Sequence, residues 1–226
     1  MPVYNEVNDI QLAVEDVQRE IFPVVLDTTL VIVDDGSTDG TSDILDRLAK
    51  NDSRVRVIHQ ANGGHGAALI AGLDSADSDV VLLIDSDRQI PLDSFAEFWT
   101  QIVTHDAVFG VRRHRDDPRS RLLLTALVRS TICILFGVRL ADANAPFKII
   151  RKSIWERLRP QIPDDTLAPS LFLAIYAQQQ RVSLLEIDVS HRRRVHGSSK
   201  IRYFKLLRFC LRAFVQLLSF SAHLTL

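Results

Sequence analysis

The sequence has few of the residues that mark several common classes of protein. Its 226 residues include only two cysteines, Cys133 and Cys210, without metal-binding or redox spacing. This argues against a disulfide framework and indicates a reducing compartment. Lysine and arginine number 27 against 28 aspartates and glutamates, so the net charge is −1. We therefore expect no nucleic-acid partner, because no overall positive charge would attract one.

Long uncharged apolar runs are also absent. No stretch reaches the roughly 18 uncharged residues of a membrane span, and the nearest candidate, 122–138, is interrupted by Arg129. The first residues have neither a basic region nor an apolar core, so no signal peptide is expected. With 46% hydrophobic and 24% charged residues, the sequence predicts one globular domain with a sizeable hydrophobic core. We expect the protein to be cytoplasmic.

Strand and helix patterns alternate through the first half of the sequence. Helical spacing of apolar residues covers 7–22, and strand-like runs occur at 29–33, 55–59 and 80–84. The order β-α-β-α-β over 29–84 predicts a parallel sheet with right-handed crossovers. The carboxyl ends of such strands share one edge, where open α/β sheets bind their ligands.

The second half continues with a mixture of helices and strands. We expect a basic loop at 191–200 and a final helix at 201–219. The remaining predicted elements are a helix at 94–104, a strand at 107–111, a helix at 122–136, a strand at 147–151, helices after Ser153 and at 167–180, and an edge strand at 182–189.

The most informative stretch joins the apolar run at 80–84 to two acids, Asp85 and Asp87. In an extended backbone the i, i+2 spacing puts both carboxylates on one side, where they repel each other unless a cation lies between them. Carboxylate oxygens suit Mg²⁺ or Mn²⁺ carrying substrate phosphates. The alternative is a simple turn before Pro91, and the triplet alone does not separate the two readings.

Other polar segments also follow predicted strands. Asp34 and Asp35, before Gly36, could bind a nucleobase or ribose, or could form a turn and a helix cap. The glycines of 63–66 could place a diphosphate at a helix N-terminus, although their spacing matches no Rossmann or Walker motif. Arg112 could grip a diphosphate or be an ordinary surface arginine.

The last forty residues are rich in lysine and arginine. The loop at 191–200 combines cationic side chains with a glycine and two serines, which favours a phosphate site. The helix that follows has a narrow basic stripe on one side, and the rest of its surface is mostly apolar. This helix is typical either of a membrane-surface helix or of a core helix with one wet face. The stripe consists of Arg202, Lys205, Arg208 and Arg212.

Taken together, these motifs resemble the family 2 glycosyltransferases of the GT-A fold, most closely the branch that includes dolichol-phosphate mannosyltransferase and other polyprenyl-phosphate glycosyltransferases. The resemblance covers nearly the whole chain. It is carried by Pro2-Val3-Tyr4-Asn5-Glu6, Val33-Asp34-Asp35-Gly36-Ser37, Gly64-His65-Gly66-Ala67-Ala68, Asp85-Ser86-Asp87-Arg88-Gln89-Ile90-Pro91, Gly110-Val111-Arg112, Asp142 to Arg151 and Arg194 to Lys200.

The resemblance implies an α/β fold of the GT-A type, with a Rossmann-like mixed sheet flanked by helices and a C-terminal amphipathic helix. A glycosyltransferase domain would span 1–200, divided into a nucleotide-sugar half at 1–110 and an acceptor half at 111–200. Residues 201–226 would form the amphipathic, membrane-surface helix.

The resemblance also implies roles for individual residues. Mg²⁺ or Mn²⁺ would be held by Asp85, Asp87 and Gln89, and Asp87, Arg112, Arg194 and Lys200 would be catalytic. The nucleotide-sugar donor would contact Pro2, Tyr4, Asn5, Glu6, Asp34, Asp35, Gly64, Gly66 and Asp85. The acceptor phosphate would contact Lys148, Arg151, Arg194, Ser199 and Lys200.

The implied activity is inverting transfer of a sugar from GDP-mannose or a UDP-sugar to a polyprenyl or dolichyl phosphate, at the cytoplasmic face of a membrane. One alternative is a hydroxyl acceptor, for which Asp164 or Asp165 could be the base. Another is a catalytically impaired nucleotide-sugar-binding protein, because the family has a complete strand before the proline found here at position 2. Lys148 also stands where the family has arginine.

Overall fold

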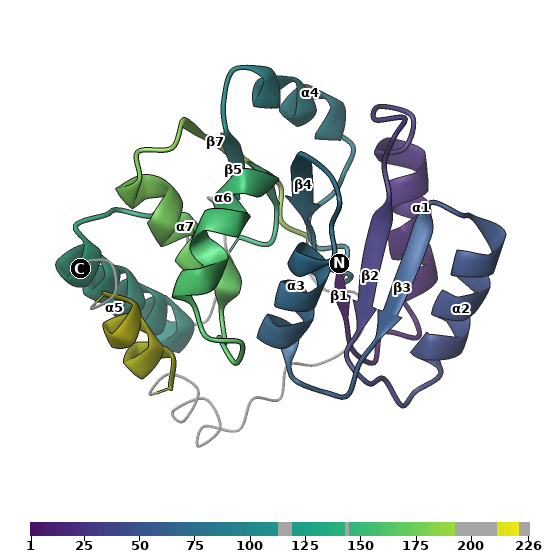
Figure 1. Cartoon of the computed structure of the whole chain (residues 1–226), viewed down its shortest axis with the longest axis horizontal. Coiled ribbons are helices and arrows are strands. Elements are labelled where there is room, and N and C mark those ends of the chain that lie inside the picture. The colour runs from purple at the N-terminus through teal and green to yellow at the C-terminus, as the bar shows by residue number, and fades with distance from the viewer. Residues whose placement is uncertain (113–118, 143–144, 193–211, 222–226) are drawn as a thin grey trace.

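Two β-sheets lie side by side and are flanked by helices (Figure 1). The computed structural model describes residues 1–112, 119–142, 145–192 and 212–221. The GT-A type of α/β architecture predicted from the sequence is confirmed. The predicted strands at 29–33, 55–59, 107–111, 147–151 and 182–189 are all present, two of them with the predicted ends and three with ends shifted by at most two residues.

The first sheet has the order β1-β2-β3 and is parallel throughout. It consists of β1 (Pro2–Val3), β2 (Leu30–Asp34) and β3 (Val55–His59). β2 is a β-branched run that is buried at four of its five positions. Helices α1 (Ile10–Glu20) and α2 (Thr41–Asn51) pack against each other beside this sheet (Figure 1).

The second sheet has the order β4-β6-β5-β7. It consists of β4 (Val80–Leu83), β6 (Lys148–Arg151), β5 (Ala107–Val111) and β7 (Leu184–Asp188). β6 is antiparallel to both β4 and β5, and β7 is parallel to β5. β4, β5 and β7 therefore run in the same direction, and their carboxyl ends meet at one edge.

The expectation that the strand at 80–84 joins the parallel sheet of β2 and β3 is corrected by this topology. The partner of β4 is β6, in the other sheet. An apolar run identifies a buried strand, but its side chains do not encode which neighbour completes its hydrogen bonds. A pocket of about 340 Å³ lies between the sheets, lined by residues that include Pro2, Val31 and Val80 to Ile84.

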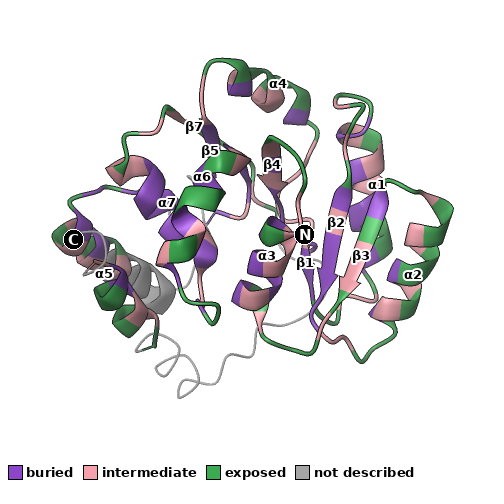
Figure 2. Cartoon of the chain, viewed as in Figure 1, coloured by how far each residue is buried: buried purple, intermediate pink, exposed green. Residues whose placement is uncertain are grey.

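The second half of the chain supplies most of the remaining helices. α7 is buried at eight of its eleven positions and forms much of the core (Figure 2). The helices are α3 (His65–Asp74), α4 (Phe95–Thr100) with a 3₁₀ turn at Gln101–Val103, α5 (Arg119–Phe136), α6 (Lys152–Leu158) with a 3₁₀ turn at Arg159–Gln161, and α7 (Pro169–Gln179).

The described part of the C-terminal segment, residues 212–221, is helical and docks on this core. Phe220 lies against the rings of Phe136 and Phe172, with ring centroids 5.8 and 4.8 Å away. Gln216 bonds to the backbone at Asp165 and Leu167. Among the described residues, no helix is long and apolar enough to cross a membrane.

Candidate functional site

The second sheet gathers polar residues at the carboxyl ends of its three co-directional strands. Asp85 and Asp87 follow β4, Arg112 follows β5, and Arg192 lies four residues after β7. The parallel register of β5 with β7 places Val111 opposite Asp188, so both strands end at the same level. The sequence predicted a ligand site at the carboxyl ends of 29–33, 55–59 and 80–84, and of these strands only β4 belongs to this sheet.

The acidic pair after β2 lies near this edge. Val3 of β1 pairs with Asp34 at the end of β2. Met1, two residues earlier, borders a small pocket together with Asp85 and Asp87. The two acidic motifs are therefore linked across a few residues of β1, and the expectation that they lie on the same side of the molecule agrees with this geometry.

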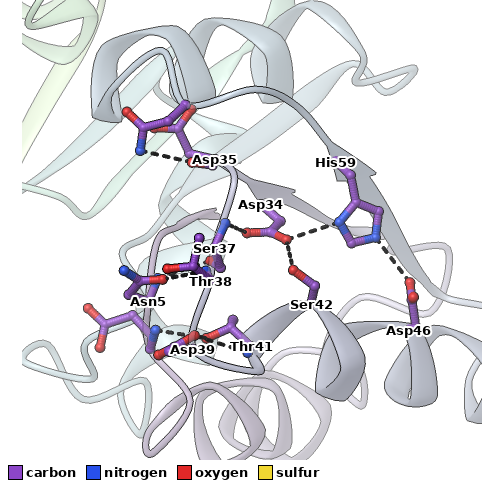
Figure 3. Close-up of polar contacts among 12 residues, drawn as sticks. Asn5, Asp34, Asp35, Ser37, Thr38, Asp39, Thr41, Ser42, Asp46 and His59 are labelled. Carbon is purple, nitrogen blue, oxygen red and sulfur yellow. Dashed lines mark hydrogen bonds and ion pairs between the residues drawn. The ribbon is translucent and has the colours of Figure 1, made fainter.

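The turn after β1 is tied to the turn after β2 (Figure 3). The backbone N–H of Asn5 donates to Ser37 Oγ at 3.0 Å, and the N–H of Thr38 donates to Asn5 Oδ1 at 2.8 Å. The N–H of Glu6 donates to Thr41 Oγ1 at 3.0 Å. Asn5 adopts a φ of 53°, which asparagine tolerates better than most residues. The side chain of Tyr4 is left 49% exposed beside this double turn.

Asp34 is a buried anchor of these turns (Figure 3). Its carboxylate accepts hydrogen bonds from the N–H of Ser37 at 3.1 Å and from the hydroxyl of Ser42 at 2.5 Å, and it contacts His59 Nδ1 at 3.0 Å. Burial alone would raise the pKa of Asp34, but these bonds outweigh it and lower the pKa. The structure thus gives Asp34 a local role in shaping the loop, and its predicted contact with the nucleotide stays a prediction.

Asp35 is also buried, and it orders the glycine turn before α3. Its carboxylate accepts the N–H of Gly63 and the N–H of Gly64, both at 2.8 Å, and the amide of Gln60 at 2.7 Å. Gly64 has a φ of +88°, which favours glycine. These N–H groups at the start of α3 therefore bind a carboxylate of the chain itself, where the sequence suggested a diphosphate.

Gly66 has a packing role that the sequence did not reveal. A Cβ atom at this position would overlap the carbonyl oxygen of Thr166 and lie 2.9 Å from that of Leu167. Gly66 therefore permits a close approach between α3 and the segment before α7, and its predicted contact with the donor stays a prediction. Only glycine leaves room for this approach.

The loop that carries Asp85 and Asp87, called the acidic motif below, is held in place by a contact with α1. Arg88 has a φ of +55° and its Nε donates to Asp16 Oδ2 at 2.6 Å. Burial opposes ionisation of Asp16, but the bonds from Arg88 and Arg19 lower its pKa overall. Within the loop, the N–H of Gln89 donates to Asp87 Oδ1 at 3.2 Å. This bracing fixes the backbone that presents Asp85 and Asp87.

The acidic motif offers two carboxylates for a divalent ion. Within the described ranges, no group of three or more His, Cys, Asp or Glu side chains converges on one point. Mg²⁺ and Mn²⁺ sites that carry substrate phosphates use one or two carboxylates and complete their shell with phosphate and water oxygens. Asp85 and Asp87 fit that requirement.

Arg112 is held by a carboxylate. Its Nε and Nη2 donate to the two oxygens of Asp142 at 2.7 and 3.1 Å, and its backbone N–H donates to the same side chain at 3.3 Å. Both side chains are largely buried. This bidentate pair orients the guanidinium at the carboxyl end of β5.

Lys148 begins β6 and is fully buried. Its Nζ donates to the carbonyl of Ala145 and to Ser170 Oγ, and it lies 5.3 Å from the centre of the Phe109 ring. Burial lowers the pKa of Lys148 to about 8, against the opposing fields of Asp142 and Asp85. The predicted contact of Lys148 with an acceptor phosphate is corrected: its ammonium faces the interior and acts on the site through its charge.

Arg151 lies at the wrong end of β6 for its predicted role. In the antiparallel register Lys148 pairs with Leu83, next to the acidic motif, whereas Arg151 pairs with Val80 at the opposite end of β4. Three residues of strand separate them by roughly 10 Å. Arg151 instead bonds to Asp106 and to the carbonyl of Ile102. Its assignment to the acceptor phosphate was wrong, because the sequence did not give the direction of this strand.

The first residues of the basic segment after β7 lie in space beside the loop of the acidic motif. The N–H of Arg192 donates to the carbonyl of Gln89 at 2.8 Å, and Gln89 Nε2 donates to the carbonyl of Arg192 at 3.3 Å. Arg194, Ser199 and Lys200 themselves lie outside the described residues. The amide nitrogen of Gln89 thus contacts this backbone, and the predicted role of Gln89 as a metal ligand stays a prediction.

The two acids considered as a base for a hydroxyl acceptor are engaged elsewhere. Asp164 pairs with Arg159, which also pairs with Asp74. Asp165 pairs with Arg212 at 3.3 Å. Both carboxylates serve to fix the segment before α7, and both are mostly exposed.

Several residues of this region were missed by sequence reasoning. Asp16, on a polar face of α1, and His59, at the end of β3, belong to patterns that any solvated helix or strand shows. Asp142 stood in a motif but had no assigned role. Only their ion-pair partners would have identified them. These partners, Arg88, Asp34 and Arg112, are distant in sequence, so no local pattern connects the two members of a pair.

Comparison with solved structures identifies the same fold in other proteins. Solved structures with the same fold include the glucosyl-3-phosphoglycerate synthase of Mycobacterium tuberculosis, with a TM-score of 0.67 at 20% identity over 98% of this chain and 78% of that chain. TarS of S. aureus (residues 1–349) gives a TM-score of 0.61 at 19% identity, over 84% of this chain and 58% of that chain.

The fold and the acidic edge thus define a protein of the GT-A class. The sequence model of glycosyl transferase family 2 matches residues 1–166, and the chain belongs to that family. Similar curated proteins are named undecaprenyl-phosphate 4-deoxy-4-formamido-L-arabinose transferase. The one from Pseudomonas aeruginosa is 30% identical over 92% of this chain, and that from Proteus mirabilis is 27% identical over 92%. The chain spans 60% and 63% of their respective lengths.

Proposed function

We propose that the protein transfers a sugar from a nucleotide-diphosphate donor to a polyprenyl phosphate, with inversion at the sugar carbon. The observation that carries the proposal is the shared edge of β4, β5 and β7. It places the carboxylates after β4, Arg112, and the start of the basic segment together. The names of the similar curated proteins, which are undecaprenyl-phosphate transferases, support the same acceptor class.

The donor would lie across this edge. Asp85 and Asp87 would hold Mg²⁺ or Mn²⁺, which when bound neutralises charge on the departing nucleoside diphosphate. Arg112, oriented by Asp142, would add a second positive charge near the leaving group. Tyr4 presents an exposed ring next to the tied turns, where it could stack on the base. The structure of the mycobacterial glucosyl-3-phosphoglycerate synthase, solved in complex with Mn²⁺ and UDP-glucose, supports a donor of this kind.

The acceptor determines whether a base is needed. A phosphate monoester has a second pKa of about 6, so at neutral pH it attacks the sugar carbon without first losing a proton. Such an acceptor requires cations, which the segment from Arg192 to Lys200 carries. The ion pairs of Asp164 and Asp165 further weaken the alternative of a hydroxyl acceptor.

The membrane is the proposed location of the acceptor, and the helix at 212–221 is the proposed contact. Phe214, Val215 and Leu218 are 44, 58 and 41% exposed on this helix, while Leu217 and Phe220 pack inward. On α5, Ile134 is 82% exposed, next to Leu135, whose carbonyl accepts a bond from Ser221. An apolar face beside a cationic segment suits the surface of an anionic bilayer at its cytoplasmic side.

A transfer assay tests the proposal. The protein is incubated with undecaprenyl phosphate, Mn²⁺ and either UDP-[¹⁴C]glucose or GDP-[¹⁴C]mannose, and the label extracted with the lipid is counted. Lys200→Ala is expected to abolish lipid labelling while the affinity for the donor stays within twofold. Donor binding without any transfer by the unsubstituted protein would favour the impaired binding protein. Labelled product formed only on a water-soluble alcohol would favour a hydroxyl acceptor.

A further inference from the structure

His59, at the end of β3, lies between two carboxylates that belong to different elements (Figure 3). Its Nδ1 is 3.0 Å from Asp34 Oδ2 at the end of β2, and its Nε2 is 3.0 Å from Asp46 Oδ1 on α2. These carboxylates are the charged groups that face the ring from β2 and α2, the two elements packed against β3. The side chain of His59 is 45% exposed, so protons from the solvent reach the ring.

This arrangement suits the protonated ring. A neutral imidazole has one N–H, so it donates to one carboxylate and turns the lone pair of its other nitrogen toward the second. An imidazolium has two N–H groups and donates to both. Both contacts are therefore hydrogen bonds only when His59 is charged. In agreement, Asp46, and then Asp34, raise the pKa of His59 against the effect of burial.

Asp34 connects His59 to the turn that carries Tyr4 (Figure 3). The other oxygen of the Asp34 carboxylate accepts the N–H of Ser37 at 3.1 Å. The hydroxyl oxygen of Ser37 in turn accepts the N–H of Asn5 at 3.0 Å. Asn5 follows Tyr4, whose exposed ring is the proposed contact with the base of the donor. The orientation of the carboxylate beside His59 therefore affects the turn that presents this ring.

We infer that His59 is a positioning residue for the nucleotide-sugar donor. As an imidazolium it holds the carboxylate of Asp34 in the orientation that fixes the turn at Asn5, and as a neutral ring it releases one of its two carboxylates. The affinity for the donor should therefore fall as the pH rises through the range in which His59 loses its proton. The role toward the donor rests on the proposed function, whereas the coupling of His59 to the turn depends only on these contacts.

Two substitutions separate the charge of residue 59 from its shape. His59→Gln removes the titration and leaves an uncharged amide, whose N–H groups are on a single nitrogen. His59→Lys keeps a positive charge between about pH 6 and 8.5, because lysine loses its proton only far above this range. His105→Gln is the matched control, since the ring of His105 contacts Gln101 and Thr104 in its own turn.

The first measurement is a pH titration by nuclear magnetic resonance of the ¹⁵N-labelled protein. Between about pH 6 and 8.5, the amide resonances of Asn5, Ser37 and Thr38 should titrate with the same midpoint as the ring nitrogens of His59. This titration should disappear in His59→Gln and persist in His105→Gln. Amide resonances that do not follow the ring, or that titrate equally in His59→Gln, would overturn the inference.

The second measurement is the Kd for UDP-[¹⁴C]glucose and for GDP-[¹⁴C]mannose, obtained by equilibrium dialysis with Mg²⁺. His59→Gln should bind the donor roughly fivefold more weakly than the unsubstituted protein at about pH 6, and equally at about pH 8.5. His59→Lys should keep the tighter binding at both pH values. A ratio between His59→Gln and the unsubstituted protein that is constant with pH would overturn the inference, because a purely structural role does not titrate.

Linkage between the proton and the donor gives a third measurement. If the protonated ring favours the donor, a saturating nucleotide sugar must raise the pKa of His59 by the logarithm of the ratio of the two Kd values. A pKa that the donor leaves unchanged or lowers would overturn the inference. Absence of binding of either nucleotide sugar by the unsubstituted protein contradicts the proposed function instead, and the titration of the turn still decides whether His59 is coupled to it.

Discussion

Gly66 of α3 lies so close to the backbone at Thr166 that a Cβ atom on Gly66 would overlap the carbonyl oxygen of Thr166. Gly66→Ala should therefore force α3 away from the segment before α7 and lower the free energy of unfolding by about 3 kcal/mol. Urea denaturation followed by circular dichroism measures this loss. Gly72→Ala in the same helix is the control, since its Cβ would meet only a side-chain methyl of Val33 at 3.3 Å. A change for Gly66→Ala no larger than for Gly72→Ala would refute the packing role.

The contacts of His59 predict a pH dependence of stability. Asp46, and then Asp34, raise the pKa of His59 against the effect of burial. A raised pKa in the folded state stabilises the fold fully below the unfolded value of about 6.5. That stabilisation is lost as the pH rises through the folded-state pKa. The contribution of His59 to the free energy of unfolding, taken as the difference between the unsubstituted protein and His59→Gln, should therefore fall from pH 6 upward, as measured by urea titrations at several pH values.

Substitution of His59 isolates its contribution. In His59→Gln the part of the pH dependence above pH 6 should be reduced, because glutamine does not titrate. Asp46→Asn should move the remaining dependence to lower pH, since it removes the largest cause of the raised pKa. Identical pH profiles in all three proteins would show that His59 is not coupled to the fold.

The Arg112–Asp142 pair predicts non-additive effects of substitution. Both side chains are buried, at 13 and 6% exposure, so removing the charge of one deprives the other of this bidentate contact. Asp142→Asn should destabilise the fold by roughly 3 kcal/mol. The double variant with Arg112→Met should lose less than the sum of the single variants. Denaturation of the four proteins gives the coupling energy, and strict additivity would contradict a direct pair.

Metal removal tests the acidic motif. If Asp85 and Asp87 hold the divalent ion, transfer should fall at least roughly 100-fold in EDTA and return on addition of Mn²⁺ or Mg²⁺. Asp87→Asn should lose activity in the presence of either ion. Asp93→Asn, a control carboxylate six residues further along, should keep it. Turnover that persists in chelator would remove the metal from the proposal.

The apolar face of the C-terminal helix predicts binding to lipid vesicles. Phe214→Ser combined with Val215→Ser should weaken co-sedimentation with vesicles of anionic phospholipid, because it removes two exposed apolar side chains. Val103→Ser is the control, since Val103 is 79% exposed on the 3₁₀ turn after α4. Equal binding by all three proteins would exclude this helix as the contact.

Much of the fold could be predicted from the sequence, because the apolar runs that form strands and the turn residues that end them are local features of the chain. The strands leading to Asp34 and Asp85 were placed within one or two residues, and the family was identified from the order of the motifs. The pairing of β4 and the reversed direction of β6 could not be predicted, because hydrogen-bond partners leave no trace in side-chain periodicity. The error about Arg151 follows directly from that gap.

Roles within the site were harder to predict than its location. Asp35 and Gly64 were both expected to face the donor, yet they bind each other. Lys148 was expected to meet a phosphate, yet its ammonium is enclosed. A polar residue at a strand end serves equally well as a ligand or as support for a turn, and only its burial and its partners separate the two roles.

The pocket between the two sheets has a consequence for the mechanics of the molecule. The pocket, about 340 Å³ in volume, separates the edge of β1 from β4, and in the described part of the chain no backbone ladder joins the two sheets there. The hydrogen bonds between β1 and β2 are therefore expected to exchange their amide protons with solvent faster than those between β5 and β6.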